Sequence, residues 1–420
     1  MSSSGSIAGA AVRDDERLIR FETVPSYAEF YARCLVPNRP CILPAGLVAH
    51  WEVVRSGSWM LDSAESAVDW GALKREYGGH VSPVVVSRID AQGQVDEERT
   101  DMTIAEAVDL IQRFKRGDHK DVQSIYIKDW HLVKQLSPTQ REQRPPYTVP
   151  DLFADDWMNN IPAPSAAQPE KDDFRFVYAG TQGSQTLLHR DVYTSYSWST
   201  NVVGRKRWHL FPPRAIPPLR RFPAVRTSAL VPHIESLLSL LNSAERKEFP
   251  QLEQAHALMQ TVDQAQHETL FVPSNWLHQV TNVTDCISIN RNWCNAANVP
   301  SLYHSIVDEL QHADDSLCDV RQMLSDAKTG EEWKREFYAL VQDVAVQDAG
   351  WAWAGFWDMV LHNLAQPATR PELRPREEWV RERLLPLVRD FEEREDGVWL
   401  DPGIRETAGK CRVLLEGQGG

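Results

Sequence analysis

The sequence places a histidine and an aspartate two positions apart in the segment TLLHRDVYTSYSW, as His189 and Asp191. In an extended strand, residues two apart point to the same face, so both side chains could contact one ion while Arg190 points away. An imidazole and a carboxylate together suit Fe(II), Mn(II) or Zn(II). Because two protein ligands rarely hold such an ion, this spacing predicts a metal site that takes a third donor from elsewhere in the chain.

The same spacing of histidine and aspartate occurs twice more, and its context argues against a metal site in both places. His119 and Asp121 follow a predicted helix in the charged loop RGDHKD, where we expect solvated side chains. His312 and Asp314 fall within a predicted helix, where residues two apart point about 200° apart and cannot share an ion. Only His189 lies in strand-like surroundings.

The third donor is predicted to be His278, in the segment TLFVPSNWLHQVTNV. A strand enters this segment, PSNW forms a turn, and alternation puts His278, Val280 and Asn282 on one face of the returning strand. A single histidine on a strand is more often a packed core residue than a ligand. The presence of His189 and Asp191 in the same strand-rich region favours the metal-binding interpretation.

A lysine in the segment GRKRWHLF is the second sign of a ligand site, because alternation puts Lys206 on the same face as Trp208. A lysine in such surroundings is seldom buried without a partner. Two interpretations stay open: the side chain reaches the rim of a barrel, or it binds the carboxylate of an anionic ligand. In CISINRNW, the polar face formed by Ser288, Asn290 and Asn292 suits a cavity that holds a polar ligand.

The elements that must position these residues change in character along the chain. Residues 1–15 are predicted to be a flexible tail, and residues 16–122 to be mixed helices and strands that flank a core. Residues 123–300 contain many short β-branched and aromatic runs between Gly, Pro and Asn, which indicates a sandwich or barrel. Residues 232–268 are predicted to be a helical insertion and residues 301–420 a helical region, so the fold class is α+β.

Composition narrows the classes of function and the compartment. The net charge of -14 argues against a general binder of nucleic acid or anionic membranes, because phosphate binding needs a basic surface. The 6 cysteines form no Cys-x-x-Cys pair, which favours a reducing compartment. No apolar run approaches membrane-spanning length, and the N-terminus resembles neither a signal nor a transit peptide. We therefore expect a protein of the cytoplasm, or also of the nucleus.

Taken together, the segments TLLHRDVYTSYSWSTNVVGRKRWHLFPP and TLFVPSNWLHQVTN resemble the Jumonji-C (JmjC) oxygenase family. The upstream segments NRPCIL, DWGALKREYGG and SIYIKDWHL match it in the same order, over residues 20–300. The resemblance implies a double-stranded β-helix core of the cupin or jelly-roll type. It also implies Fe(II) and 2-oxoglutarate as cofactors, with ascorbate as a supporting reductant and dioxygen as the oxidant.

Three segments, YIKDWHL, SYSWSTNVVGRKRW and ISINRNW, are similar to a subgroup of lysyl hydroxylases that modify the eukaryotic peptide-chain release factor during translation termination. The resemblance assigns iron binding to His189, Asp191 and His278, and contacts with 2-oxoglutarate to Lys206, Thr186, Tyr126 and Asn290. Two departures stand out. Ser199 occupies a position where many relatives carry Asn, and the predicted insertion lengthens the connection between the iron ligands beyond what a minimal core needs.

Three other functions are alternatives to lysyl hydroxylation. A JmjC lysine (histone) demethylase would use the same chemistry on an N-methyl group, so the site residues alone do not exclude it. Hydroxylation of a tRNA base fits poorly with an acidic chain that lacks a basic stripe. A catalytically dead metal-binding scaffold is a candidate from another class, but Lys206 and all three metal ligands would then serve no evident purpose.

The segment WAWAGFWDMVLHNLA, at residues 351–365, is too apolar for a helix that faces water. We expect it to pack on the barrel, on another helix, or on a second copy of the chain. Because related hydroxylases often dimerise through C-terminal helices, a homodimer is one of these predicted arrangements.

Overall fold

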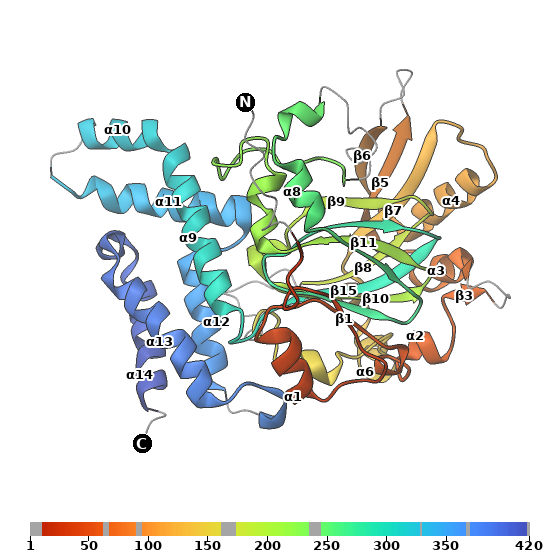
Figure 1. The fold of residues 1–420 in the computed structure, drawn as a ribbon, viewed down its shortest axis with the longest axis horizontal. Coiled ribbons are helices and arrows are strands. Elements are labelled where there is room, and N and C mark those ends of the chain that lie inside the picture. The colour runs from red at the N-terminus through yellow and green to blue at the C-terminus, as the bar shows by residue number, and fades with distance from the viewer. Residues whose placement is uncertain are drawn as a thin grey trace. The chain divides into compact units, whose positions relative to one another are not determined.

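The structure is a computed structural model that describes residues 11–61, 67–89, 95–160, 174–234, 245–327, 330–366 and 370–417. The chain divides into two compact units. The first comprises Met1–Pro150, Asp173–Asp191 and Ser197–Asn292, and it contains the sheets. The second comprises Asp151–Asp172, Val192–Tyr196 and Trp293–Gly420, and it is mainly helical. Helices and strands are labelled in Figure 1.

Two of the longer helices in the first unit begin at side-chain caps that are visible in the sequence. Thr103 and Glu106 form a reciprocal capping box at the start of α4, and Asp69 accepts a hydrogen bond from a backbone N–H at the start of α3. The helix predicted just before the loop RGDHKD is therefore confirmed as α4. The α-helices described in this unit are α1 (Tyr27–Phe30), α2 (Glu52–Arg55), α3 (Trp70–Tyr77), α4 (Ile104–Lys115), α5 (Leu132–Gln135), α6 (Pro138–Gln143) and α8 (Leu252–Ala257), and the π-helix η1 (Tyr31–Leu35) follows α1.

The larger sheet has nine strands in the order β1-β2-β13-β10-β15-β8-β7-β5-β6. Its strands are β1 (Ile19–Arg20), β2 (Cys41–Leu43), β5 (Val81–Ile89), β6 (Val95–Thr103), β7 (Val122–Trp130), β8 (Arg175–Gly180), β10 (Tyr196–Val203), β13 (Thr269–Val272) and β15 (Cys286–Trp293). The neighbours β8 and β15 are antiparallel, as are β10 and β13. Strands far apart in the sequence are therefore neighbours, as the double-stranded β-helix requires.

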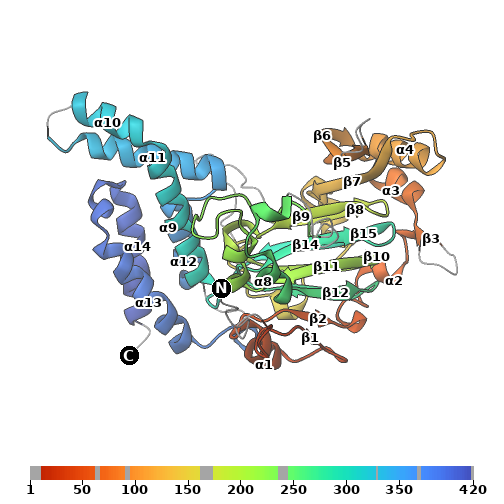
Figure 2. The same ribbon diagram turned by 45° about the horizontal axis from the view of Figure 1, so that its top comes forward.

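The smaller sheet has four strands in the order β12-β11-β14-β9, and a further pair is formed by β3 (Met60–Leu61) and β4 (Ala67–Val68). The four strands are β9 (Gln185–His189), β11 (Lys206–Phe211), β12 (Gln260–Gln264) and β14 (Leu277–Asn282). Figure 2 shows them alongside β8, β15 and β10 of the larger sheet. The two sheets form the predicted jelly-roll core, so the α+β fold class is confirmed.

Apolar side chains fill one part of the space between these strands. Trp208 and Leu210 of β11 pack with Val280 of β14 and with Leu270 of β13 in one buried cluster. Complete burial of such a side chain contributes roughly 1.5–3 kcal/mol to the free energy of unfolding. This cluster makes a rigid wall beside the positions that carry the candidate ligands.

The predicted helical insertion at 232–268 needs a correction. Residues 235–244 lie outside the described residues, and Leu252–Ala257 is helical, but Gln260–Gln264 is strand β12, paired along its length with β11. The composition around β12 suggested a helix, because glutamine and glutamate favour helices. Alternate burial of its side chains, with Val262 at 8% exposure, shows that cross-strand packing decides the structure here.

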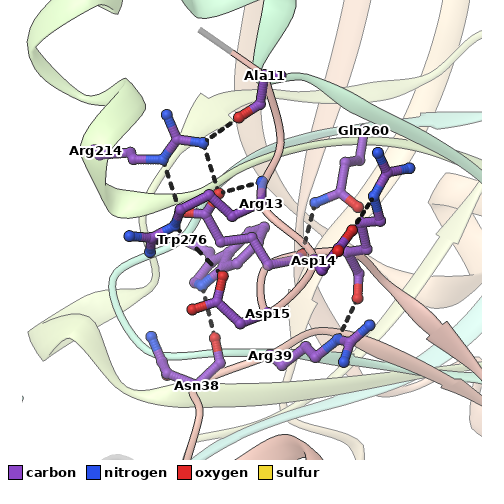
Figure 3. Close-up of polar contacts among 11 residues, drawn as sticks. Ala11, Arg13, Asp14, Asp15, Asn38, Arg39, Arg214, Gln260 and Trp276 are labelled. Atoms are coloured by element: carbon purple, nitrogen blue, oxygen red, sulfur yellow. Dashed lines mark hydrogen bonds and ion pairs between the residues drawn. The ribbon is translucent and has the colours of Figure 1, made fainter. Parts of the chain in front are cut away.

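The predicted flexible tail at 1–15 also needs a correction. Residues 1–10 lie outside the described residues, whereas the segment that follows is held in place by Arg214 (Figure 3). Its guanidinium donates to the carbonyl of Ala11 at 2.7 Å and to the carboxylate of Glu16 at 2.7 and 2.8 Å. Burial alone would raise the pKa of Glu16, but the Arg214 hydrogen bonds help to bring that pKa below its usual value.

The second unit is built from long helices. They are α9 (Val299–Ser316), α10 (Cys318–Ala327), α11 (Trp333–Ala349), α12 (Trp353–Ala365), α13 (Glu377–Glu393) and α14 (Pro402–Gly417), and η3 (Asp151–Phe153) precedes them in the sequence. Their amphipathic patterns bury one face each, except that α10 buries no residue. Within the described part of the chain, no helix is both long and apolar enough to cross a membrane.

The apolar segment at 351–365 forms α12, and its aromatic rings are buried among other helices. Trp353 and Trp357 both pack on Phe391 of α13. The ring centroid of Phe391 lies 5.0 Å from that of Trp353 and 5.1 Å from that of Trp357. Trp353 also packs on Tyr303 of α9 at 4.9 Å. Packing on neighbouring helices is therefore the expected arrangement that the structure confirms. The homodimer stays a prediction, tested by whether the mass in solution is twice the 47.8 kDa of the chain.

Candidate metal centre

Two adjacent strands bring the three candidate metal ligands together. His189 is the last residue of β9, and the antiparallel register places it directly opposite His278 of β14. The two imidazole centroids lie 4.2 Å apart, and His278 Nε2 lies 3.9 Å from Asp191 Oδ2. One ligand atom from each of the three residues lies within 4.8 Å of the others. The predicted group is thus assembled, although Asp191 lies just after the strand rather than in it.

Hydrogen bonds fix the orientation of each ligand. His189 Nδ1 lies 2.8 Å from the carbonyl oxygen of Leu187, and His278 Nδ1 lies 3.2 Å from that of Trp276. Each Nδ1–H therefore donates to the backbone, which leaves Nε2 with its lone pair for a metal. Ser197 donates to Asp191 Oδ2 at 2.7 Å, so the carboxylate is held as well.

The electrostatics favour a neutral imidazole at His189. Burial lowers the pKa of His189 to about 4, and the neighbouring His278 adds to that shift. A histidine must be neutral to coordinate a metal. Two imidazoles and one carboxylate form the facial triad that suits Fe(II) with open coordination positions, so the donor set fits the implied metal.

Lys206 is buried next to this group rather than at a barrel rim. It is only 2% exposed, and its Nζ donates to Ser288 Oγ at 2.6 Å. Burial lowers the pKa of Lys206, and the neighbouring Cys286 opposes that shift. Among the described residues, no carboxylate lies within 4.0 Å of the ammonium group. A buried cation without a protein counter-charge fits the carboxylate of a bound ligand such as 2-oxoglutarate.

The other predicted contacts of 2-oxoglutarate line the same cavity as the metal ligands. Tyr126 belongs to β7 of the larger sheet and Thr186 to β9 of the smaller one, so both sheets contribute to the cavity wall. Asn290 of β15 accepts a hydrogen bond from Ser199 at 3.1 Å. The serine that departs from the family pattern therefore still contacts a pocket residue. The structure brings together all the residues predicted to bind the metal or its ligand, and their roles stay proposals.

Sequence reasoning missed several residues that line the cavity. Tyr178 of β8 lies opposite Ser288 in the sheet, and its hydroxyl donates to Asp129 at 2.7 Å. Its alternation with Phe176 in FRFVYAG was a usable signal, because Tyr178 shares the face that the pocket requires. Ser197 had no such signal, since it reaches Asp191 through a turn whose shape the sequence does not specify. The remaining lining residues were not missed, because alternation had already placed them on the same faces as the candidate ligands: Trp208, Val280 and Asn292.

The two other copies of the histidine–aspartate spacing do not form a metal site among the described residues. Asp121 is exposed and pairs with Arg88 at 2.9 Å, as a solvated loop predicts. His119 differs from the prediction, because it is half-buried and its Nε2 is covered. His312 and Asp314 lie on α9, as predicted.

Comparison with known proteins gives a consistent result. Residues 27–298 match the Cupin-like domain family. The mouse protein named 2-oxoglutarate and iron-dependent oxygenase JMJD4 is 32% identical over 287 residues, which cover 68% of this chain and 62% of the relative. The human protein of that name is 31% identical over 306 residues, covering 72% and 67% of the two chains. The Arabidopsis thaliana protein named arginine-specific demethylase JMJ20 is 30% identical over 312 residues, covering 72% and 62%.

The matches leave part of each relative uncovered. This chain spans less than two thirds of the length of the mouse and Arabidopsis relatives. The match to the family covers the strands of the first unit except β1, and it stops before α9 begins. The matched part of this chain therefore includes the jelly-roll core and the metal group inside it.

Proposed function

This chain belongs to the Cupin-like domain family, in its JmjC form, and from that premise we propose that it is an Fe(II)- and 2-oxoglutarate-dependent protein hydroxylase. The observation that carries the proposal is the cavity that holds the His189, Asp191 and His278 group together with the buried Lys206. A site that bound only a metal would not need a buried lysine beside it, and a site that bound only an anion would not need the metal group. The two together fit an enzyme that binds both Fe(II) and 2-oxoglutarate.

Each residue of the cavity would have a distinct task. His189, Asp191 and His278 would hold the iron, and Lys206 would bind the distal carboxylate of 2-oxoglutarate. Tyr126, Thr186 and Asn290 would supply further hydrogen bonds to that ligand. When bound, Fe(II) and 2-oxoglutarate supply the power to oxidise a C–H bond with dioxygen. The chain contributes placement, through the oriented imidazoles and the residues that line the cavity.

For the substrate, we propose a lysyl side chain of the eukaryotic peptide-chain release factor. The support is the similarity of YIKDWHL, SYSWSTNVVGRKRW and ISINRNW to the subgroup that carries out this modification. The first of these segments includes the end of β7, and the other two form β10, the start of β11 and β15, so all three border the cavity. This substrate would require the enzyme to work in the cytoplasm.

The experiment that tests the proposal measures the intact mass of recombinant release factor. The factor is incubated with the full chain, Fe(II), ascorbate, dioxygen and 2-oxoglutarate. We expect a gain of one oxygen atom that depends on 2-oxoglutarate and is absent with the Asp191→Ala variant. Succinate formation without a mass change would keep the oxygenase and reject the substrate. If metal-loaded protein gave neither signal, the scaffold alternative would be favoured.

A second candidate reaction is the removal of an N-methyl group, which the similarity to the arginine-specific demethylase JMJ20 supports. Hydroxylation of an N-methyl carbon gives a hemiaminal that releases formaldehyde, so one methylene is lost instead of one oxygen gained. The same mass measurement on a methylated peptide therefore separates the two reactions. Formaldehyde release without oxygen gain on the release factor would favour demethylation.

A further inference from the structure

The turn between β13 and β14 determines where His278 lies. It comprises residues 273–276, so His278 follows it by two positions. Asn275 adopts a left-handed backbone conformation with φ 62°, which is unfavourable for a residue with a side chain. The turn precedes a ligand and is strained, so its neighbours must hold it in place.

Asn38 holds this turn through three hydrogen bonds. Its side-chain amide donates to the carbonyl of Ser274 at 2.8 Å, and its side-chain oxygen accepts from the N–H of Ser274 at 2.9 Å. Its own carbonyl accepts from Trp276 Nε1 at 3.1 Å, as Figure 3 shows. Asn38 thus pairs with Ser274 much as a neighbouring strand would, from a position 236 residues earlier in the chain.

The same turn is bonded directly to His278, and through Arg190 to the segment that carries His189 and Asp191. The carbonyl of Trp276 is the acceptor for His278 Nδ1, at 3.2 Å. Asn275 Oδ1 accepts a hydrogen bond at 3.0 Å from Arg190, the residue between His189 and Asp191. Arg190 points away from the cavity, as alternation predicts, and reaches the turn of the neighbouring strand pair. The position of the turn therefore affects the orientation of one imidazole and the segment that carries the other two ligands.

We propose that Asn38 is a positioning residue of the metal centre, which acts on His278 through the turn at 273–276. The proposal rests on the metal site described under the proposed function. Partners that orient ligating histidines typically change metal affinity by about 10–100-fold when they are removed. The Asn38 side chain acts at Ser274, two residues before the Trp276 carbonyl that orients His278, so we expect the lower end of this range. A purely structural asparagine would affect the stability of the fold and leave metal affinity unchanged.

The substitution Asn38→Gly separates these two roles. Asn38 has φ 54°, a left-handed conformation that glycine adopts without cost. The variant keeps the backbone carbonyl that accepts from Trp276 and removes both side-chain hydrogen bonds to Ser274. The matched control is His267→Gly, because His267 has φ 65° and lies in the turn at the opposite end of β13.

The experiment measures Co(II) binding by the full chain, free of other metals, with thermal unfolding of the metal-free protein as a second measurement. We expect the Kd for Co(II) to rise about 10-fold in Asn38→Gly and to stay unchanged in His267→Gly. Asn38→Asp keeps the acceptor for the Ser274 N–H but turns a carboxylate oxygen toward the Ser274 carbonyl in place of the donor, so it should also weaken binding. It also serves if the glycine variant does not fold.

Wild-type affinity in both Asn38 variants would overturn the proposal, even if both unfold at a lower temperature. Equal weakening in His267→Gly would overturn it as well, because any left-handed turn would then suffice. If the wild-type chain did not bind Co(II), the metal site itself would be rejected, and the proposal about Asn38 with it. The wild-type titration thus distinguishes failure of the site from failure of the positioning role.

Discussion

Replacement of Lys206 by methionine should weaken ligand binding far more than it changes stability. Lys206 is 2% exposed, and its one hydrogen bond among the described residues is to the neutral Ser288. Replacing a buried ion pair with well-packed apolar side chains is often neutral or stabilising by about 1–4 kcal/mol, and the same saving in desolvation applies to a buried ammonium group. The loss of the hydrogen bond to Ser288 costs about 1 kcal/mol. We therefore expect the free energy of unfolding of the metal-free protein to change by between about -1 and about +3 kcal/mol.

The affinity for 2-oxoglutarate should fall steeply in the same variant. Removing one partner of a buried, hydrogen-bonded charge pair costs about 2–5 kcal/mol, because the other charge stays buried without a partner. At about 1.4 kcal/mol for each factor of ten, the Kd for 2-oxoglutarate should rise about 30-fold to several-thousand-fold. Calorimetric titration of 2-oxoglutarate into the Mn(II)-loaded chain measures this change without turnover, and urea unfolding of the metal-free chain measures stability.

The control for this pair of measurements is Lys115→Met, which removes an exposed lysine that pairs with Asp285. Its effects on both quantities should be small, because exposed ion pairs contribute about 0–1 kcal/mol. If Lys206→Met bound 2-oxoglutarate like the wild type and unfolded more easily, the lysine would be a structural residue. The assignment of the cavity to a dicarboxylate would then be refuted.

Three further predictions concern the sheets and their supports. Gly204→Ala should destabilise the fold by roughly 2–5 kcal/mol in urea unfolding, because φ is +84° and a Cβ would lie 2.1 Å from a backbone oxygen. Gly183→Ala should cost only about 1–2 kcal/mol, because Gly183 has the same φ but nothing within 4 Å of the added Cβ. Equal costs for the two variants would contradict this reasoning. Ser197→Ala should weaken Co(II) binding about 10-fold by freeing Asp191, and unchanged binding would show that the hydroxyl does not hold the carboxylate. Glu16→Gln should lower the free energy of unfolding by about 1.5–3 kcal/mol at pH 7. Because the folded-state pKa of Glu16 lies below 4.5, the difference in stability between variant and wild type should shrink as the pH falls below 4.5. A difference in stability that does not depend on pH would contradict the account.

Much of the site could be predicted because strand geometry is local. Alternation along a strand places Lys206 on the face of Trp208, and the structure has both in the cavity wall. The same periodicity identified the strand that carries His278 and the turn before it. What alternation does not provide is the pairing of β9 with β14 that puts His189 and His278 opposite each other, since register is set by packing across the sheet.

The remaining features depend on contacts between distant segments. Gln260–Gln264 forms a strand because it pairs with β11, and the local amino-acid preferences do not predict this pairing. The sequence predicts only that Asn38 lies in a turn. Its hydrogen bonds to Ser274 depend on the three-dimensional proximity of two turns that are distant in the chain. Ser197 reaches Asp191 across a connection whose path the sequence leaves open. In each case the deciding interaction joins residues whose relative position is a property of the whole fold.

The most direct test of the central claim is the conversion of 2-oxoglutarate to succinate by the purified full chain with Fe(II), dioxygen and the release factor. The cavity geometry predicts succinate formation by the wild type and its loss in Asp191→Ala, with both proteins equally folded. The account would be contradicted if wild-type protein that has bound Fe(II) formed no more succinate than the Asp191→Ala variant. An intact metal group together with Lys206 would then not be sufficient for oxygenase activity.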